Sequence, residues 1–296
     1  MLSEIESEGH HMVQIKSFFH QGSSTFSYLV SDTDTHHAAL IDPVLDFDAA
    51  AGRTGTASAA AVVAYIRGAG LTLDWILETH AHADHLSAAQ HIKQELGGRI
   101  AIGEGIRQVQ QVFAKLFDVE AEVPADGSQF DHLFKDGETF QIGSLEVRVM
   151  ATPGHTSDSL AYAIDDAVFT GDTLFMPDSG TARCDFPGGD AGMLYDSIQR
   201  MLALPPTTRM FLCHDYAPGG REYKNETTVA DQKRDNIHVH DGISREEFIK
   251  LRTTRDGTLK VPALLLPAVQ VNIRAGALPE PETNGMSYLK IPLNRF

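Results

Sequence analysis

The apolar and polar positions along this chain follow two periodicities, which together predict alternating strands and helices. Runs that are continuously apolar, or that alternate with polar residues, are typical of strands. They occur at 15–19, 25–30, 38–41, 74–78, 99–102, 145–151, 160–164, 167–170 and 210–213. Helical segments are predicted at 57–68, 86–96, 105–117, 191–204, 228–236 and 244–255. This alternation predicts a layered α/β fold.

The segments between these elements predict turns and loops. Residues 46–56 contain Gly and Asp and are interpreted as a loop. Thr56 stands directly before an Ala-rich helical segment and is expected to cap it. Asp165 and Asp166 separate two short strands and predict the turn of a hairpin. The segment after residue 255 is interpreted as a Pro-rich tail.

The composition is that of one large globular unit. The chain has 296 residues, of which 42% are hydrophobic, and this is enough for a single core. A net charge of −16 argues against nucleic acid or an anionic membrane as the main partner. No apolar run reaches about 18 residues, so no membrane span is expected, and the N-terminus lacks the apolar region of a secretory signal.

Cysteine usage and the N-terminal residues complete this outline. Cys184 and Cys213 cannot form a disulfide framework, and they fit a reducing, cytoplasmic compartment. Residues 1–11 include Gly9-His10-His11 and are expected to be a tag or a disordered N-terminus. Residues 12–296 are then expected to form one catalytic domain. The sequence does not fix the oligomeric state, and a homodimer is compatible with it.

The densest group of chemically active residues directly follows the predicted strand 74–78. His80, His82, Asp84 and His85 stand within six residues, and an apolar core has no use for four polar side chains so close together. In extended backbone the two histidines at positions i and i+2 project to the same side. Imidazole and carboxylate groups at this spacing indicate a metal site.

Three further candidate ligands also follow the ends of apolar strands. They are His155, Asp172 and His214. Loops at the carboxyl ends of strands are where open α/β sheets place their sites. Gly154 can adopt a positive φ, which allows a tight fold of the backbone that turns His155 toward the other ligands.

Seven nitrogen and oxygen ligands, with no thiolate required, suit zinc, iron or manganese. They can be divided into two sites, with His80, His82 and His155 in one, Asp84, His85 and His214 in the other, and Asp172 bridging. Two ions would generate a hydroxide nucleophile for hydrolysis. Alternatively, two histidines and one carboxylate hold a single ion with three open positions, as in non-haem Fe(II) oxygenases. The ligand count does not decide between these arrangements.

The order and strand-end placement of these seven residues resemble the metallo-β-lactamase superfamily. This resemblance implies a four-layer αββα sandwich, here with a C-terminal helical extension. Within the superfamily, four segments resemble the bacterial persulfide dioxygenases (sulfur dioxygenases). They are 42–46 (DPVLD), 79–88 (THAHADHLSA), 181–190 (TARCDFPGGD) and 213–216 (CHDY). The likeness extends from about Met12 to the C-terminus.

The resemblance implies an enzyme with one Fe(II) per chain, bound by His80, His155 and Asp172. The remaining four residues of the set would orient these ligands and water; they are His82, Asp84, His85 and His214. The implied substrates are glutathione persulfide and O2, and the implied products are sulfite and glutathione. Iron would supply the oxygen chemistry, and the protein would supply placement and charge.

Two residues match the family's substrate pocket. Arg183 is expected to bind a carboxylate of glutathione, because a planar guanidinium matches carboxylate geometry. Tyr216 matches a family tyrosine beside the substrate. Cys184 adjoins Arg183, and a nearby guanidinium would lower the pKa of its thiol and make it reactive.

The main alternative is a dinuclear thioesterase like glyoxalase II (hydroxyacylglutathione hydrolase), which uses the same seven positions for two metals. The segment 183–186 resembles the dioxygenases and favours them over this alternative. A non-catalytic redox sensor that binds metal would not need all seven ligands. A lactamase activity is not favoured, because nothing in the sequence resembles a secreted enzyme.

Overall fold

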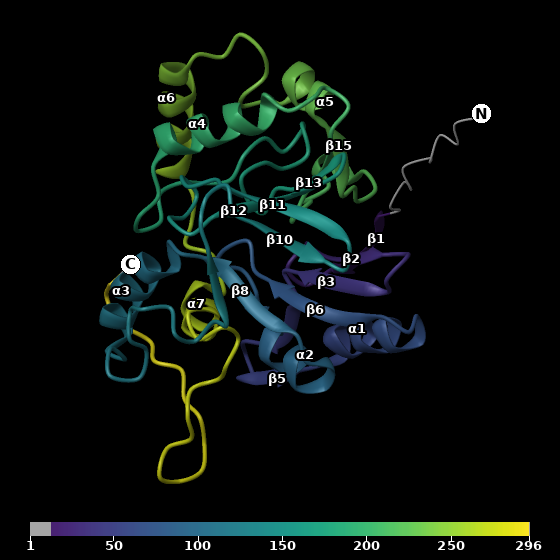
Figure 1. Ribbon diagram of the computed structural model, residues 1–296. Helices are drawn as coiled ribbons and strands as arrows, with labels where there is room; N and C mark the ends of the chain where they lie inside the picture. Colours follow the sequence, from purple (N-terminus) through teal and green to yellow (C-terminus); the bar gives the residue numbers. More distant parts are fainter. Residues whose placement is uncertain (1–12, 296) are drawn as a thin grey trace, which may run out of the picture.

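The computed structural model describes residues 13–295 and contains two facing six-stranded sheets (Figure 1). The expectation for residues 1–11 lies outside the described residues. In spatial order, the first sheet contains β1 (Val13–His20), β2 (Thr25–Asp32), β3 (His37–Ile41), β6 (Thr72–Leu77), β8 (Arg99–Gly103) and β9 (His132–Phe134). The second contains β10 (Thr139–Ile142), β11 (Leu145–Ala151), β12 (Leu160–Ile164), β13 (Ala167–Phe169), β14 (Arg209–Phe211) and β15 (Glu226–Thr228).

Helices cover the outer face of each sheet (Figure 1). Over the first sheet lie α1 (Ala57–Gly68), α2 (Ala89–Leu96), α3 (Ile106–Phe117) and α7 (Leu265–Asn272). Over the second lie α4 (Ala191–Leu202), α5 (Val229–Asp235) and α6 (Arg245–Asp256). A small third sheet pairs β5 (Arg53–Gly55), β4 (Val44–Asp48) and β7 (Leu86–Ser87). A 3-10 turn, η1, spans Pro218–Gly220.

The core between the two sheets is rich in aromatic side chains. Tyr28 from the first sheet packs within reach of Phe169 and Phe211 from the second, with ring centroids 5.2 and 5.6 Å away. Neighbouring residues of β2, such as Leu29, face the helices instead. Every residue of β2 is therefore buried, as expected for a strand that is covered on both faces.

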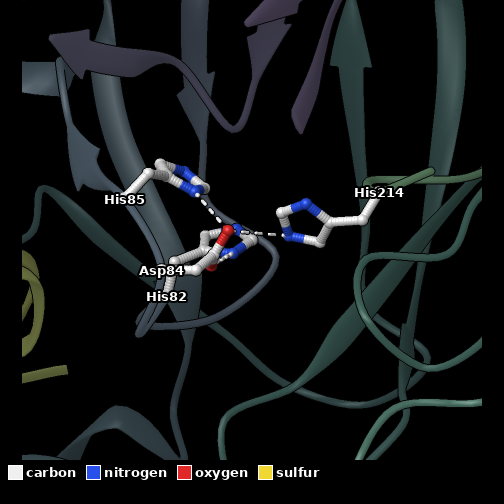
Figure 2. A group of neighbouring side chains, drawn as sticks. All are labelled: His82, Asp84, His85 and His214. Atoms are coloured by element: carbon white, nitrogen blue, oxygen red, sulfur yellow. Dashed lines mark ion pairs between the residues drawn. The ribbon is translucent and has the colours of Figure 1, made fainter. Parts of the chain in front are cut away.

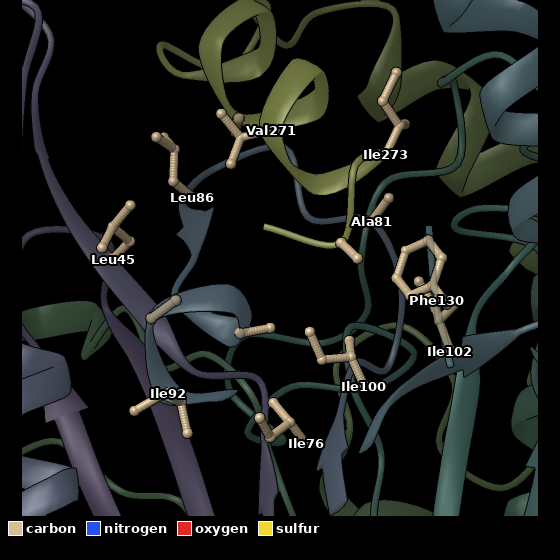
Figure 3. Close-up of a cluster of buried hydrophobic side chains, with 14 of the residues drawn as sticks. Leu45, Ile76, Ala81, Leu86, Ile92, Ile100, Ile102, Phe130, Val271 and Ile273 are labelled. Carbon is tan, nitrogen blue, oxygen red and sulfur yellow. The ribbon is translucent and has the colours of Figure 1, made fainter. Parts of the chain in front are cut away.

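The outer cores complete the layering. Figure 3 shows Ile76 and Ile100 from the first sheet facing Ile92 of α2 and the segment around Val271 of α7. On the other side, Val168 of the second sheet belongs to the cluster that includes residues of α4 and α6. The predicted four-layer αββα sandwich with additional C-terminal helices is confirmed.

The predicted strands and helices are recovered, with four local corrections. Residues 46–56 include part of a hairpin between β4 and β5, because residues 46–48 pair with 53–55. The predicted helix 86–96 begins only at Ala89, because Leu86 and Ser87 pair with β4. Thr56 makes no side-chain cap; Asp46 instead accepts from the Ser58 amide at 2.9 Å.

The fourth correction concerns the C-terminal tail, which contains the buried helix α7. Its sequence, LLPAVQVN, has a proline near its start and apolar residues on most sides. Proline is tolerated in the first helical turn, where its missing N–H is not needed. Tertiary burial against the first sheet therefore stabilises a helix that the local pattern did not predict. Within residues 13–295, no helix has the length and apolarity needed to cross a membrane.

Truncation of Ile76 tests the outer core. Ile76 is fully buried, whereas Ile291 is 67% exposed. We expect Ile76→Ala to lower the free energy of unfolding by about 2–5 kcal/mol, because it leaves a cavity, and Ile291→Ala to change it by less than about 0.5 kcal/mol. Urea unfolding followed through the fluorescence of the single Trp75 measures both values. Equal losses in the two variants would contradict this packing.

Candidate metal centre

The candidate ligands meet at one edge of the two sheets. The segment from His80 to His85 follows the end of β6, and His155 follows β11. Asp172 follows β13 and His214 follows β14. The expected strand-end placement is confirmed, and the facing of the two sheets brings residues more than 130 positions apart into one cluster.

Gly154 shapes the approach of His155. Its φ is +137°, a conformation that side chains rarely adopt. A Cβ at this position would lie 2.2 Å from the backbone nitrogen of Leu194. The loop therefore packs directly against the backbone of α4. This contact fixes the position of the backbone at His155.

One group of ligand atoms contains His80, His155 and Asp172. These three residues offer ligand atoms within 4.8 Å of one another, and all three are buried. Asp172 Oδ2 lies 3.7 Å from His80 Nε2 and 3.8 Å from His155 Nε2. This group is the two-histidine, one-carboxylate set that the sequence singled out.

A second group contains His82, Asp84, His85 and His214 (Figure 2). Asp84 lies centrally: its Oδ2 is 3.3 Å from His214 Nε2 and 3.5 Å from His85 Nδ1. The two-site division expected from sequence placed His82 with the first group, whereas its ligand atoms here belong with Asp84 and His214. Asp172 Oδ1 lies 3.2 Å from His214 Nε2 and connects the two groups.

Polar contacts fix which ring nitrogen of three of the histidines faces the centre. His155 Nδ1 lies 2.6 Å from the backbone oxygen of Arg183, which can only accept, so Nδ1 donates. His82 Nε2 faces Asp42 Oδ1 at 3.2 Å. Thr79 donates its hydroxyl to Asp42 at 2.9 Å, so it accepts from His80 Nδ1 at 3.1 Å. In each of these three rings the other nitrogen faces the centre, where it can bind a metal once it is unprotonated.

The atoms that face the centre have no hydrogen-bond partner. Among the described residues, these buried and unsatisfied atoms are His80 Nε2, His82 Nδ1, Asp84 Oδ2, His85 Nε2, Asp172 Oδ1 and His214 Nε2. Leaving a buried polar atom unpaired costs about 1–3 kcal/mol, so six such atoms in two adjoining groups favour a ligand that is not part of the chain. Lone pairs of imidazole and carboxylate fit a transition-metal cation.

The charge distribution fits a cation as well. Burial alone would raise the pKa of Asp172, but His214 and His80 hold it below its ordinary value. Burial would lower the pKa of His214, but Asp172 and Asp84 raise it to about 9. Deeper in the protein, burial and the nearby Asp42 raise the pKa of Glu78 to about 8. The carboxylates facing the centre are therefore ionised, as metal ligands must be.

Asn272 supports the ligand loop from the C-terminal helix α7. Its side-chain amide donates to the backbone oxygens of His82 and His85 at 2.8 and 2.9 Å, and its Oδ1 accepts from the Ser87 amide at 2.8 Å. The sequence analysis missed this residue, because it lies in the segment that was interpreted as a tail. It also missed Asp42, which lay within the recognised segment 42–46 but received no role.

A cavity of about 290 Å³ opens onto the first group. Arg183 and Tyr216, the two predicted substrate residues, both line it. Tyr216 is 54% exposed and stacks on His214, with ring centroids 6.0 Å apart. Arg183 forms a two-pronged ion pair with Asp185, at 2.6 and 2.7 Å. The protein therefore already supplies a carboxylate to the guanidinium that was expected to bind glutathione.

The expected activation of Cys184 is wrong. The thiol is buried and donates to Asp256 at 3.3 Å. Burial, followed by the contact with Asp256, raises the pKa of Cys184 to about 12. Burial and Asp256 outweigh the guanidinium of Arg252, and the thiol is held in its neutral, unreactive form.

A thiol-labelling experiment checks this conclusion. At pH 7 we expect neither Cys184 nor Cys213 to react with iodoacetamide in the folded protein, since both are buried and both have raised pKa values. In urea both should be labelled, and mass spectrometry counts the adducts. Rapid labelling of Cys184 in the folded protein would show that it is accessible and ionised.

Replacement of Asn272 tests its support of the ligand loop. We expect Asn272→Ala to weaken metal binding by about 10–100-fold, because residues that orient ligands have effects of this size. Titration of the metal-free protein against a chromophoric chelator measures the affinity. The exposed Asn284 provides a matched control, and Asn284→Ala should leave the affinity unchanged. Unchanged affinity in Asn272→Ala would remove this residue from the site.

Comparisons with known proteins agree with this arrangement. Residues 20–214 match the model of the metallo-beta-lactamase superfamily. The chain is 52% identical to a probable metallo-hydrolase of Burkholderia pseudomallei over 290 residues, which cover 95% of this chain and 99% of that protein. It is 50% identical to glyoxylase B2 of Dictyostelium discoideum over 283 residues, covering 95% and 97% of the two chains.

More distant similarity links the chain to persulfide dioxygenases. The mitochondrial persulfide dioxygenase ETHE1 of Bos taurus is 29% identical over 267 residues, or 89% of each chain. The crystal structure of ETHE1 from Myxococcus xanthus superposes with a TM-score of 0.72 at 32% identity, covering 89% of this chain and all of that one. The matched residues 20–214 include all seven candidate ligands. The αββα layers are those of the structural match. The chain therefore belongs to the metallo-beta-lactamase superfamily.

Proposed function

We propose that this protein is a persulfide dioxygenase that oxidises glutathione persulfide at one Fe(II) ion bound by His80, His155 and Asp172. One observation carries the proposal: two imidazoles and one carboxylate offer ligand atoms within 4.8 Å of one another, and His155 and Asp172 line an open cavity. Such a set leaves coordination positions free for substrate and O2. The similarity to the ETHE1 proteins supports this choice of chemistry.

The proposed net reaction balances without a further reductant. Glutathione persulfide, O2 and water give glutathione, sulfite and two protons; the S–S bond breaks, and the terminal sulfur gains three oxygens. Iron(II) bound at this site would activate O2 for transfer to sulfur. The apolar rings of Phe175 and Phe186 line the cavity beside the ligands and limit the access of water.

The second group of residues has a positioning role in this proposal. His214 Nε2 lies 3.2 Å from Asp172 Oδ1, so this contact fixes one carboxylate oxygen. The other oxygen, Oδ2, then faces His80 and His155. Asp42 fixes the ring of His82 in a similar way. His214 thereby holds the carboxylate of Asp172 in an orientation that presents its other oxygen to His80 and His155.

The second candidate function is a dinuclear thioesterase of the glyoxalase II type. The observation that favours it is the second group itself, which offers three histidines and a carboxylate for another ion. The 50% identity to glyoxylase B2 points in the same direction. The two candidates differ in metal content and in whether O2 is consumed.

Metal analysis with activity measurements on anaerobically purified protein separates the candidates. We expect about one iron per chain and O2 uptake on addition of glutathione persulfide. His80→Ala and Asp172→Ala should each reduce the uptake by more than about 100-fold, since loss of a ligand exceeds the loss of an orienting residue. His91→Ala, in α2 away from the cavity, is the matched control and should retain activity. Two metals per chain with hydrolysis of a glutathione thioester and no O2 uptake would establish the thioesterase instead.

A further inference from the structure

The wall of the active-site cavity contains three arginines, and they differ in their partners. Arg183 belongs to the loop before α4, while Arg252 and Arg255 belong to α6 of the C-terminal extension. All three line the same cavity as His155 and Asp172. A cavity with several guanidinium groups suits an anionic ligand. An arginine is available to bind that ligand only if no carboxylate of the protein already pairs with it.

Two of the three are neutralised by the protein. Arg183 uses Nε and Nη2 for Asp185 and donates Nη1 to the backbone oxygen of Lys260 at 2.7 Å. Arg252 is fully buried, pairs with Asp256 and donates to the backbone oxygen of Thr181 at 3.1 Å. Binding a substrate carboxylate at either position would require breaking an existing ion pair.

Arg255 has no such partner. Among residues 13–295, no carboxylate lies within ion-pair distance of its guanidinium, and no hydrogen bond from that group is formed. Its side chain is exposed to solvent and lines the cavity. Arg255 also lies near His238, whose pKa is lowered to about 4 by burial, Arg252 and Arg255 together.

We propose that Arg255 binds a carboxylate of the substrate's thiol carrier, while the reacting sulfur lies at His155 and Asp172. This inference rests on the proposed function for the identity of the substrate as glutathione persulfide. A free guanidinium offers two parallel N–H donors to a carboxylate without losing an internal partner. Arg255 therefore takes the role that the sequence analysis assigned to Arg183, and Arg183 holds the loop that carries the backbone oxygen bonded to His155.

The volume of the cavity agrees with a reacting sulfur at His155 and Asp172 and a carboxylate at Arg255. Its volume of about 290 Å³ is at the lower end of the range of roughly 300–1,000 Å³ for ligand pockets. Leu259 and Pro262, which follow α6, form the apolar wall beside Arg255.

The test compares a carboxylate-bearing persulfide with one that lacks carboxylates. For Arg255→Ala we expect the KM for glutathione persulfide to rise by about 10-fold or more, the loss of one charged hydrogen-bonded contact, with little change in kcat. Oxidation of inorganic hydrogen persulfide should be unaffected. Arg255→Lys should restore part of the affinity. Lys250→Ala, a basic and exposed residue of the same helix, is the matched control and should behave as the unmodified protein.

Two results would overturn the assignment: an unchanged KM for glutathione persulfide, or an equal rise in KM for both persulfides. Calorimetric titration of the metal-loaded protein with reduced glutathione separates this proposal from the proposed function. If the protein consumes no O2, the dioxygenase proposal fails. Weaker binding of glutathione to Arg255→Ala than to Lys250→Ala would still support Arg255, and equal binding would refute it.

Discussion

The lone pairs of buried imidazole and carboxylate groups that lie close together repel one another, and these groups have lost their contacts with water. The arrangement of this site has to offset both costs. Six unsatisfied nitrogen and oxygen atoms of the described residues lie beneath the surface, in two neighbouring groups that Asp172 connects. A cation with empty coordination positions can accept lone pairs from the group of His80, His155 and Asp172, and the other four residues offer a similar set beside it. Residues around the site, among them Asp42 and Asn272, hold these atoms in place despite the free-energy cost of burying them.

The two sheets and the C-terminal helices contribute in different ways to the arrangement of the site. The strands end at a common edge, and the packing of aromatic side chains between the sheets sets the distance between the loops from each sheet. The C-terminal helices then act on opposite sides of the centre. Asn272 in α7 holds the backbone of the His82–His85 loop, and α6 contributes Arg252 and Arg255 to the wall of the cavity.

The cavity wall shows why counting charged residues does not locate a binding group. Arg183 and Arg255 are both guanidiniums beside the same ligands, yet Asp185 neutralises one of them and no carboxylate reaches the other in the described chain. The same reasoning applies to Cys184: Arg183 is next to it in sequence, but Asp256 contacts its thiol and raises its pKa. The chemistry of each group is set by the carboxylate that contacts it, which for Cys184 comes from a distant part of the chain.

The sequence by itself determined the layered fold and singled out seven candidate ligands at strand ends, because apolar periodicity, the cluster at 80–85 and the residues that follow each strand are all patterns along the chain. Gly154 was also predictable, since its conformation is local. The tertiary structure alone decided that Leu86 and Ser87 form a strand, that 265–272 form a helix, and that Asp46, rather than Thr56, caps α1. It also decided which ring nitrogens face the centre and which arginine remains free. These features depend on partners from distant segments, and no pattern along the chain records how such segments meet.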